Sequence, residues 1–402
     1  MLLRGRRMSA ILLRIIIVTS VMASCGHVSA QSTELHPQEL VTLAPQHEFG
    51  KTHLLGISAD GKTALVWKWG RSRGYVAAIR MDSEEMTNKT ADMVTHPLNS
   101  FTIPASGEFS YLELDFIERA NHRMLWNFDD GPAPRDLCPG SVLLRHGDFQ
   151  PIDEYVWVGI ARTRAGEPYS LVKIRLADCS IIKSVAPDDK HVTTSGIRQL
   201  RISPTGTKVA YIIDRGVARG NLIVSERDIW IRDTATLDVL ARIRPVKSWN
   251  YGSLAWSPDE KQLLAAAYNK GLQRGCHVFV FRSEDGIHLR SWDTAGCTSL
   301  AISMDGFFFA TARTEIQPQG RWFLRRGIVD LYDVETGAEV AVAHLPWQKG
   351  DSDVEIDLVP IAFTADGKYV IASGGDMIVW ELPEAAQLRG RRAETAAAQG
   401  DK

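Results

Sequence analysis

Short apolar runs that alternate with turn residues recur along the chain. A representative copy is IAFTADGKYVIASGG at residues 361–375, where two apolar runs flank a turn of Thr, Ala, Asp, Gly and Lys. The related copies read GISADGKTALVW, FTIPASGEFSYLEL, RISPTGTKVAYII, AWSPDEKQLLAAA and AISMDGFFFATA. Runs rich in Val, Ile, Leu and aromatic residues predict β-strands, and Asp, Pro and Gly between them predict tight turns. The pattern therefore predicts a series of β-hairpins.

Each hairpin is followed by a third apolar run that ends at an acidic turn, as in DIWIRDT, HVFVFRSED and IVDLYDVETG. Weaker fourth runs such as VLARIR and EVAVAHL come next, and a degenerate copy, LLRHGDFQPIDEYVWVGI, brings the count to seven units. Four short strands per unit are typical of a β-propeller blade. We therefore predict an all-β chain: a single seven-bladed β-propeller of four-stranded antiparallel blades over residues 39–385, with six or eight blades as alternatives.

The phrases WSPDEKQLLAAA, DIWIRDTAT and VDLYDVETG resemble WD repeats and related repeats of secreted propellers, including those of the TolB kind. The resemblance implies a fold and no particular activity. Most units lack the Gly-His pair of true WD repeats, and several loops between the second and third strands are long. The looser propellers of the cell envelope are therefore the nearer relatives.

The last unit lacks a fourth strand of its own. After MIVWELPE the chain enters a polar tail, residues 386–402, which we predict to be disordered. ELVTLAPQ, at residues 39–46, is an unassigned apolar segment. We predict that this N-terminal strand completes the last blade and closes the ring, because closure removes an exposed sheet edge.

The first thirty residues read as a secretory signal peptide, with four arginines, a short apolar run and the small residues Val28, Ser29 and Ala30 before the cleavage site. A competing interpretation is a lipobox at residues 22–25, in which Cys25 becomes lipidated. Either way we expect an exported, periplasmic or cell-envelope protein, with membrane attachment only through that lipid. The net charge of −2 favours neither nucleic acid nor a membrane surface as partner.

Four cysteines remain after the signal: Cys138, Cys179, Cys276 and Cys297. Disulfides persist in an oxidising compartment. Cys276 begins a third strand and Cys297 approaches the next first strand, so both lie toward one side of adjoining blades and we predict that they pair. A pairing of Cys138 with Cys179 looks strained because the two fall on opposite sides, and four free thiols are the alternative.

Arginine is concentrated in the loops that join the second strand (b) of a unit to its third strand (c). Arg is suited to bidentate recognition of carboxylate, phosphate or sulfate. Arg that merely solvates loop ends and pairs with local acids is the alternative. The long loops expected at residues 214–227 and 313–326 are the strongest candidates, because insertions on one side of a propeller often carry the binding site. The candidate binding residues are Arg71, Arg73, Arg123, Arg162, Arg164, Arg215, Arg219, Arg274, Arg321, Trp322, Arg325 and Arg326.

Linear catalytic motifs are missing from the sequence. The histidines have no metal-ligand spacing, and there is no haem attachment, nucleophile-elbow or P-loop motif. The acidic run at residues 351–357 departs from a calcium loop because Ile356 stands where glycine is expected. We therefore expect no cofactor and no metal, and a monomeric, non-catalytic binding module or scaffold for an anionic protein or envelope polymer. The alternative is a propeller enzyme of the lactonase, lyase or quinone-dependent dehydrogenase type, with its residues gathered around the axial channel.

Overall fold

The computed structural model describes residues 33–34 and 37–38 and, with gaps, the strands and turns between residues 51 and 382. Side chains are described chiefly within residues 199–382, with gaps at 216–225, 247–248, 270–274, 320–322, 348–360, 365–366 and 373–377, and at some positions in 64–79 and 156–186. Everything described belongs to the unit Ser32–Lys402. The predicted signal peptide and lipobox, the predicted strand 39–46 and the tail 386–402 lie outside the described residues.

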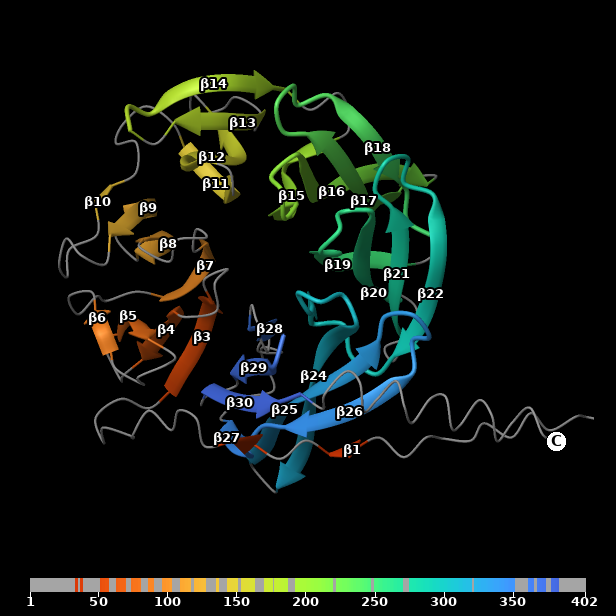
Figure 1. Cartoon of the computed structure of the whole chain (residues 1–402). Helices are drawn as coiled ribbons and strands as arrows, with labels where there is room; N and C mark the ends of the chain where they lie inside the picture. The colour runs from red at the N-terminus through yellow and green to blue at the C-terminus, as the bar shows by residue number, and fades with distance from the viewer. Residues whose placement is uncertain are drawn as a thin grey trace, which may run out of the picture. The chain divides into compact units, whose positions relative to one another are not determined.

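The elements in the described residues are all β-strands, and they form seven sheets (Figure 1). The first sheet contains β3 (Lys51–Ile57), β4 (Thr63–Trp69), β5 (Gly74–Arg80) and β6 (Met86–Lys89). The second contains β7 (His96–Thr102), β8 (Phe109–Phe116), β9 (Arg119–Asn127) and β10 (Arg135–Asp136). The third contains β11 (Leu143–Gln150), β12 (Asp153–Arg162), β13 (Ser170–Arg175) and β14 (Ser180–Val185).

The second half of the chain repeats this arrangement. The fourth sheet contains β15 (Val192–Ile202), β16 (Lys208–Arg219), β17 (Leu222–Asp233) and β18 (Val239–Ile243). The fifth contains β19 (Trp249–Trp256), β20 (Gln262–Asn269), β21 (Cys276–Arg282) and β22 (His288–Thr294). The sixth contains β23 (Ser299–Ile302), β24 (Phe308–Gln319), β25 (Trp322–Asp333), β26 (Glu339–His344) and β27 (Gln348–Gly350), and β28 (Ile361–Phe363), β29 (Tyr369–Ser373) and β30 (Met377–Glu381) begin the seventh.

In the first six sheets the first four strands pair antiparallel in sequence order, as predicted for a propeller blade, and β28, β29 and β30 of the seventh do the same. In the sixth sheet β27 also pairs with β25, beside β26. The first strand of one sheet contacts the first strand of the next along the series β3, β7, β11, β15, β19, β23 and β28. Strand β3 also contacts β29 and β30 of the last sheet. The first strands therefore line the centre of the arrangement, and the fourth strands lie outermost (Figure 1).

Two short N-terminal strands join the last two sheets. Strand β2 (Pro37–Gln38) pairs antiparallel with β30 and is the fourth strand of the seventh sheet, while β1 (Thr33–Glu34) pairs parallel with β26. An N-terminal segment thus takes the predicted position beside β30, but it lies upstream of residues 39–46. The alternation of apolar residues drew the prediction to ELVTLAPQ, whereas pairing at a sheet edge depends on main-chain groups.

The recurring turn phrase has a common hydrogen-bonded structure. The hydroxyl of the Ser or Thr that starts the turn accepts a hydrogen bond from the main-chain N–H five residues later. The donors and acceptors are Lys208 and Ser203 at 3.0 Å, Gln262 and Ser257 at 2.9 Å, Phe308 and Ser303 at 3.0 Å, and Tyr369 and Thr364 at 3.1 Å. In these four units the phrase recurs because the hairpin between the first and second strands is closed by the same side-chain contact.

The hydrophobic core lies between neighbouring sheets. Strand β20 is buried on both faces: Leu263, Ala265 and Ala267 pack with Ile229 and Ile231 of the fourth sheet, whereas Leu264 and Ala266 pack with residues of the sixth. A strand buried on both faces needs a continuous apolar run rather than alternation. This explains why residues 263–267 of β20 read as the unbroken apolar run LLAAA.

Candidate functional site

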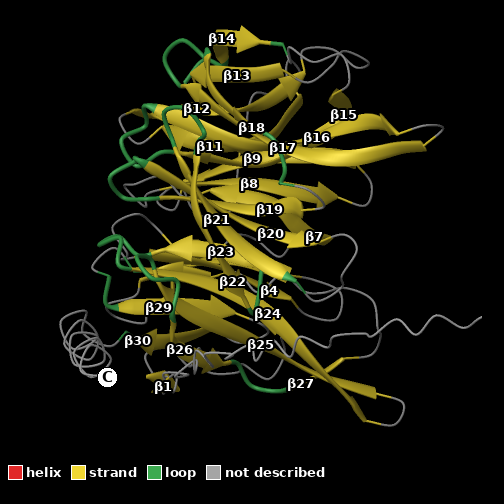
Figure 2. Cartoon of the chain, turned by 90° about the vertical axis from the view of Figure 1, so that its right-hand side faces the viewer, coloured by secondary structure: helices red, strands yellow, loops and turns green. Residues whose placement is uncertain are grey.

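Two long β-hairpins distinguish the fourth and sixth sheets. Strands β16 and β17 are each 12 residues long, as are β24 and β25, and two residues connect the strands of each pair. We call residues 214–227 the first arm and residues 314–327 the second arm. Figure 2 shows both arms reaching past the other sheets on the same side of the unit. This is the side on which the arginine-rich b–c connections were predicted.

The two arms have the same register, shifted by 100 residues. Lys208 is opposite Asp233 and Arg219 opposite Leu222 in the fourth sheet. Phe308 is opposite Asp333 and Gln319 opposite Trp322 in the sixth sheet. Each position of the first arm therefore has a structural counterpart in the second.

The arms correct one prediction. Residues 214–227 and 313–326 were predicted to be long loops, but the structure extends both strands of the hairpin through them to a two-residue connection. Polar residues interrupt the apolar pattern there because the arms leave the core, so the apolar signal of a strand is lost although the main-chain pairing continues.

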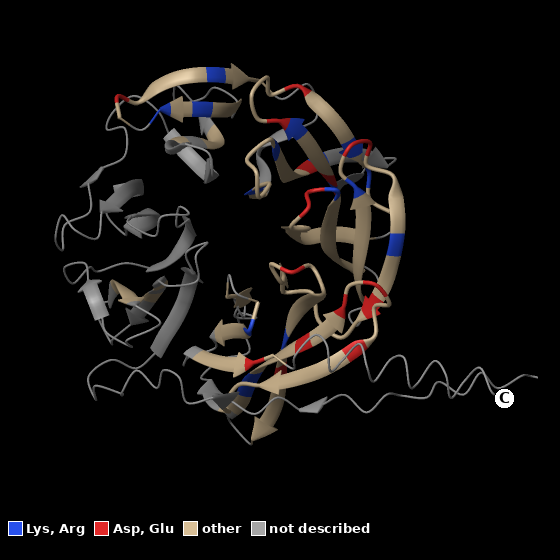
Figure 3. Cartoon of the chain, viewed as in Figure 1, with Lys and Arg blue, Asp and Glu red and all other residues tan. Residues whose placement is uncertain are grey.

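Ion pairs cross the first arm. The Arg215 guanidinium lies 3.2 Å from Glu226, and the Arg227 guanidinium lies 2.9 Å from Asp214. Arg227 also donates a hydrogen bond to the carbonyl oxygen of Tyr251 in the fifth sheet at 3.1 Å. Figure 3 shows basic and acidic positions interspersed in this sheet. Each arginine thus stiffens the arm as well as contributing charge to this side of the unit.

A buried carboxylate lies at the root of the first arm. Asp228 is fully buried, and its Oδ2 lies 3.4 Å from Nε of Arg215 and 3.6 Å from Nε of Arg242. Burial raises the pKa of Asp228, although the charges of Arg215, Arg242 and Arg244 oppose that shift. Arg242 also lies over the ring of Trp230, 4.2 Å from its centroid. The root therefore holds a buried acid between two arginines of neighbouring strands.

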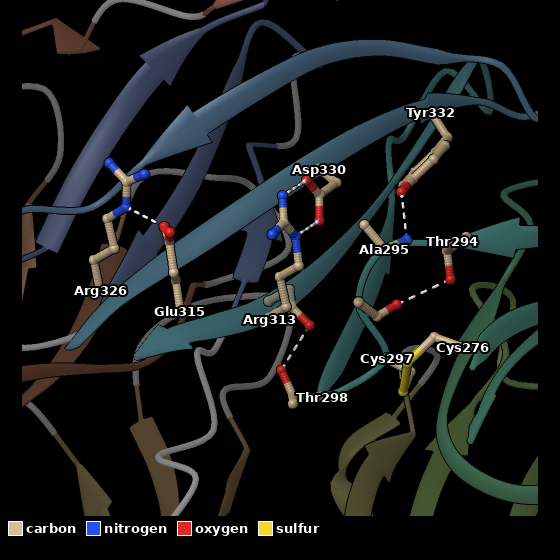
Figure 4. A network of polar contacts seen from close by, with 12 residues as sticks. Cys276, Thr294, Ala295, Cys297, Thr298, Arg313, Glu315, Arg326, Asp330 and Tyr332 are labelled. Atoms are coloured by element: carbon tan, nitrogen blue, oxygen red, sulfur yellow. Dashed lines mark hydrogen bonds and ion pairs between the residues drawn. A yellow bond between two sulfur atoms is a disulfide. The ribbon is translucent and has the colours of Figure 1, made fainter. Parts of the chain in front are cut away.

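The second arm carries the same cross-strand pair with its charges exchanged. Nε of Arg326 donates to the Glu315 carboxylate at 2.6 Å (Figure 4). Glu315 and Arg326 occupy the positions of Arg215 and Glu226 in the first arm. The Arg326 guanidinium also lies over the ring of Trp347, 4.6 Å from the centroid. Trp347 immediately precedes β27, which pairs antiparallel with Phe323, Leu324 and Arg325.

The root of the second arm is fixed by a bidentate ion pair. Nε and Nη2 of Arg313 donate to the two oxygens of the fully buried Asp330 at 2.9 Å and 3.2 Å (Figure 4). Burial alone would lower the pKa of Arg313, but the hydrogen bond and the charge of Asp330 outweigh it and raise the pKa. A bidentate, partly buried pair holds its geometry better than an exposed one.

The predicted disulfide is present beside this root. Cys276 and Cys297 are bonded, with their Cα atoms 5.5 Å apart (Figure 4). Nearby, the Tyr332 hydroxyl accepts a hydrogen bond from the main-chain N–H of Ala295, and the Thr298 hydroxyl donates to the carbonyl oxygen of Ala312. The connection between the fifth and sixth sheets is therefore held covalently and by hydrogen bonds. Cys179 is also disulfide-bonded, and its partner lies outside the described residues, so four free thiols can be set aside.

The other predicted binding residues divide by how far they are described. Only the main chain is described for four of them: Arg123 in β9, Arg162 in β12, Arg219 in β16 and Trp322 in β25. Arg325 lies in β25, opposite Gln348 of β27. Arg71, Arg73, Arg164, Arg274 and Arg321 lie outside the described residues, as does the acidic run 351–357.

The sequence pattern did not predict several features of these arms. Asp228 and Asp330 sit inside strands, and Trp347 follows a strand, so turn and loop signals did not mark them. The 100-residue frame that aligns the two hairpins does not mark the acids either, because it places Ile328 at the position of Asp228 and Trp230 at the position of Asp330.

In the part of the chain that the structure describes, no three His, Cys, Asp or Glu side chains come together as a metal site. Among the same residues, no helix has the length and apolar content that crossing a membrane requires.

Comparison with known proteins supports the fold. No protein-family model matches the chain, and no curated protein matches it. The Cps50 (Swd1) β-propeller domain of Myceliophteria thermophila is similar in structure, with 12% identity and a TM-score of 0.52, over 83% of this chain and 97% of that one. Kuenenia stuttgartiensis hydrazine synthase is similar at 13% identity and a TM-score of 0.54, over 83% and 96% of the two chains.

An oligogalacturonate lyase solved in complex with manganese is similar at 12% identity and a TM-score of 0.55, over 83% of this chain and 91% of that one. These likenesses define the class: the chain has a β-propeller fold. At this level of identity they show the fold alone. Because the similar structures include a WD-type propeller domain and enzymes, function has to be argued from the arms.

Proposed function

We propose that this protein is an exported, non-catalytic binding module, a closed seven-bladed propeller that recognises an anionic protein segment or polymer with its two arms. The observation that carries the proposal is the pair of arms in equivalent register on one side of the unit. Contacts of β3 with β29 and β30, and the pairing of β2 with β30, support closure into a ring.

The charge of the arms supports an anionic partner. The first arm has three arginines against two acids, and the second has three arginines against one acid, Glu315. The cross-strand pairs fix Arg215 and Arg326, so these two guanidinium groups need little ordering when a partner arrives. Pre-organised donors bind with a smaller entropic loss than flexible ones.

The test is binding of poly-L-glutamate to the purified protein, measured by calorimetry at increasing sodium chloride. We expect affinity to fall by about tenfold or more between low and moderate salt, because exposed charges are screened. The triple substitution Arg321→Ala, Arg325→Ala and Arg326→Ala should weaken binding by at least about tenfold at low salt.

The matched control replaces arginines on the opposite side of the sheets. Arg175 and Arg282 end the third strands β13 and β21, and each pairs with the aspartate three residues later. Arg175→Ala and Arg282→Ala should leave binding unchanged. Salt-insensitive binding, or equal loss in both sets of variants, would contradict a specific basic surface.

A propeller enzyme is the second candidate, favoured by the similarity to an oligogalacturonate lyase solved with manganese. Elemental analysis and an absorption spectrum of the purified protein, followed by titration with manganese alone, separate the two. A stoichiometric metal or a chromophore supports the enzyme. A protein that contains neither of them supports the binding module.

A further inference from the structure

The outer edge of β17 in the first arm differs from its counterpart in the second arm. In the second arm, β27 pairs with Phe323, Leu324 and Arg325, so that edge is covered by the chain itself. The positions 100 residues earlier are Ile223, Val224 and Ser225. In the part of the chain that the structure describes, β17 has a strand on that side only at Ile229–Arg232, where β18 pairs with it.

The connection that follows β18 explains the difference. Strand β18 ends at Ile243 and β19 begins at Trp249, whereas β26 ends at His344 and β28 begins at Ile361. The longer connection supplies β27. In the shorter one, the Trp249 N–H donates to the carbonyl oxygen of Val246 at 3.0 Å, which turns the chain toward the fifth sheet. Among the described residues of this connection, none pairs with Ile223–Ser225.

The register shows which main-chain groups face this edge. Arg219 and Leu222 pair across a two-residue connection, so their polar groups point toward each other. Pairing alternates along a strand, so the polar groups of Ile223 and Ser225 point to the outer edge. Their counterparts Phe323 and Arg325 are opposite Gly350 and Gln348 of β27.

We propose that the edge of β17 at Ile223–Ser225 binds an extended acidic segment of a partner protein by antiparallel β-strand addition. Strand addition uses main-chain hydrogen bonds for affinity and side chains for specificity. β27 is the template, because it occupies the equivalent edge of the sister arm. The inference deepens the proposed function, since it states how an anionic protein segment would be held.

Charge identifies the occupant. The first arm has an excess of arginine. The chain's own edge strand continues directly into an acidic run, Asp351, Asp353, Glu355 and Asp357. An extended segment that becomes acidic beyond its pairing residues therefore complements the arm, and a basic segment would be repelled.

The probe is a fluorescein-labelled peptide with the sequence of residues 347–357, WQKGDSDVEID, titrated with the full-length protein and followed by fluorescence anisotropy. Ser225→Pro removes the outward N–H, and proline is tolerated at a sheet edge. We expect it to weaken binding by at least about tenfold. Ser225→Ala keeps the N–H and should bind as the wild type does, and circular dichroism and Tm establish that both variants fold.

Backbone methylation of the peptide gives an independent test. In the template register the N–H groups of Gln348 and Gly350 face the arm, whereas that of Lys349 faces away. N-methylation at Gln348 should abolish binding, and N-methylation at Lys349 should leave it unchanged. Equal effects at the two positions would overturn strand addition.

The remaining outcomes are also decisive. Binding that survives Ser225→Pro but is lost in the Arg321, Arg325 and Arg326 triple variant overturns the edge site and leaves the proposed function standing. If poly-L-glutamate binding does not depend on the arms, while Ser225→Pro still weakens peptide binding, the proposed function is contradicted and the edge site stands. No peptide binding, together with dimerisation that Ser225→Pro abolishes, assigns the edge to a second copy and overturns the proposal.

Discussion

Gly337 shows how closely neighbouring sheets approach at single residues. It has a φ of +70°, and a Cβ atom at this position would overlap the ring of Trp292 in the neighbouring sheet. Gly306 has a similar φ of +72°, but the nearest atom to its Cβ position is Cδ of Pro258 at 3.5 Å. Both glycines have a positive φ, but only Gly337 lies against a side chain of the neighbouring sheet. Comparing substitutions at the two positions therefore separates the cost of backbone strain from the cost of a steric clash between sheets.

We expect Gly306→Ala to lower the free energy of unfolding by about 1 kcal/mol, the strain of a left-handed residue. Gly337→Ala should cost more than about 2 kcal/mol, because Trp292 must also move. Chemical denaturation of the two variants measures the difference. Equal losses would mean that the Trp292 ring shifts without cost.

Glu260 links two sheets at their turns. Its carboxylate accepts hydrogen bonds from the Thr205 N–H and, at 3.0 Å, from the Thr207 hydroxyl of the neighbouring sheet. Burial alone would raise the pKa of Glu260, but hydrogen bonds from Thr205, Ser203 and Thr207 outweigh burial and lower it. The charged form is therefore the one that stabilises the fold.

A lowered pKa gives a definite pH dependence. The contribution of Glu260 should be fully present above the unfolded pKa of about 4.3 and lost as the pH falls through the lower folded pKa. Glu260→Gln should cost about 1–3 kcal/mol at pH 7 and progressively less in acid. Unfolding of Glu260→Gln across this pH range measures the effect, with the exposed Glu284→Gln in the nearby turn as control. A cost that does not change with pH would contradict the assignment.

At the scale of elements, the arms show what the sequence pattern could and could not predict. The strands that lie in the core were predicted because burial imposes an apolar pattern on them. Beyond the core, cross-strand pairs such as Glu315 with Arg326 maintain the strands instead, and such polar residues resemble those of a loop. Strand β27 was missed for the same reason, because Gln348–Gly350 has no apolar pattern.

The exchanged charges of the arms predict a double-mutant result. Glu315→Arg and Arg326→Glu should each lower the free energy of unfolding by about 0.5–1 kcal/mol, since like charges then face each other across the hairpin. Combining them recreates the order of Arg215 and Glu226 and should restore most of the loss. A coupling energy near zero from the cycle would show that the pair contributes only solubility.

At the scale of the whole molecule, the repeat predicted the fold, and the repeat alone could not predict the site. Similar turn chemistry recurs in most units, so all-β architecture followed from residues such as Ser203 and Ser303. Pairings between distant segments leave no local pattern, which is why the pairing of Pro37–Gln38 with β30 was not predicted. The disulfide between Cys276 and Cys297 was predictable because it depends on strand order, which the repeat supplies.

The pairing of β2 with β30 makes the N-terminal segment part of the last sheet. Removing residues 1–38 should expose the outer edge of β30, lower the Tm by several degrees and promote aggregation, because unpaired edges recruit other strands. Thermal unfolding and light scattering, compared with a chain that starts at residue 31, measure this. An unchanged Tm would show that the stability of the last sheet does not depend on that strand.

The constant 100-residue spacing of the arms has a consequence for how this surface can vary. Residues 214–227 and 314–327 behave as interchangeable cassettes, since each begins and ends at the same place on its sheet. A grafted hairpin of the same length would leave the strand register in the buried part of the sheet unchanged. On the proposed function, recognition would diversify at the tips of the arms while the folding of the sheets beneath them stays unchanged.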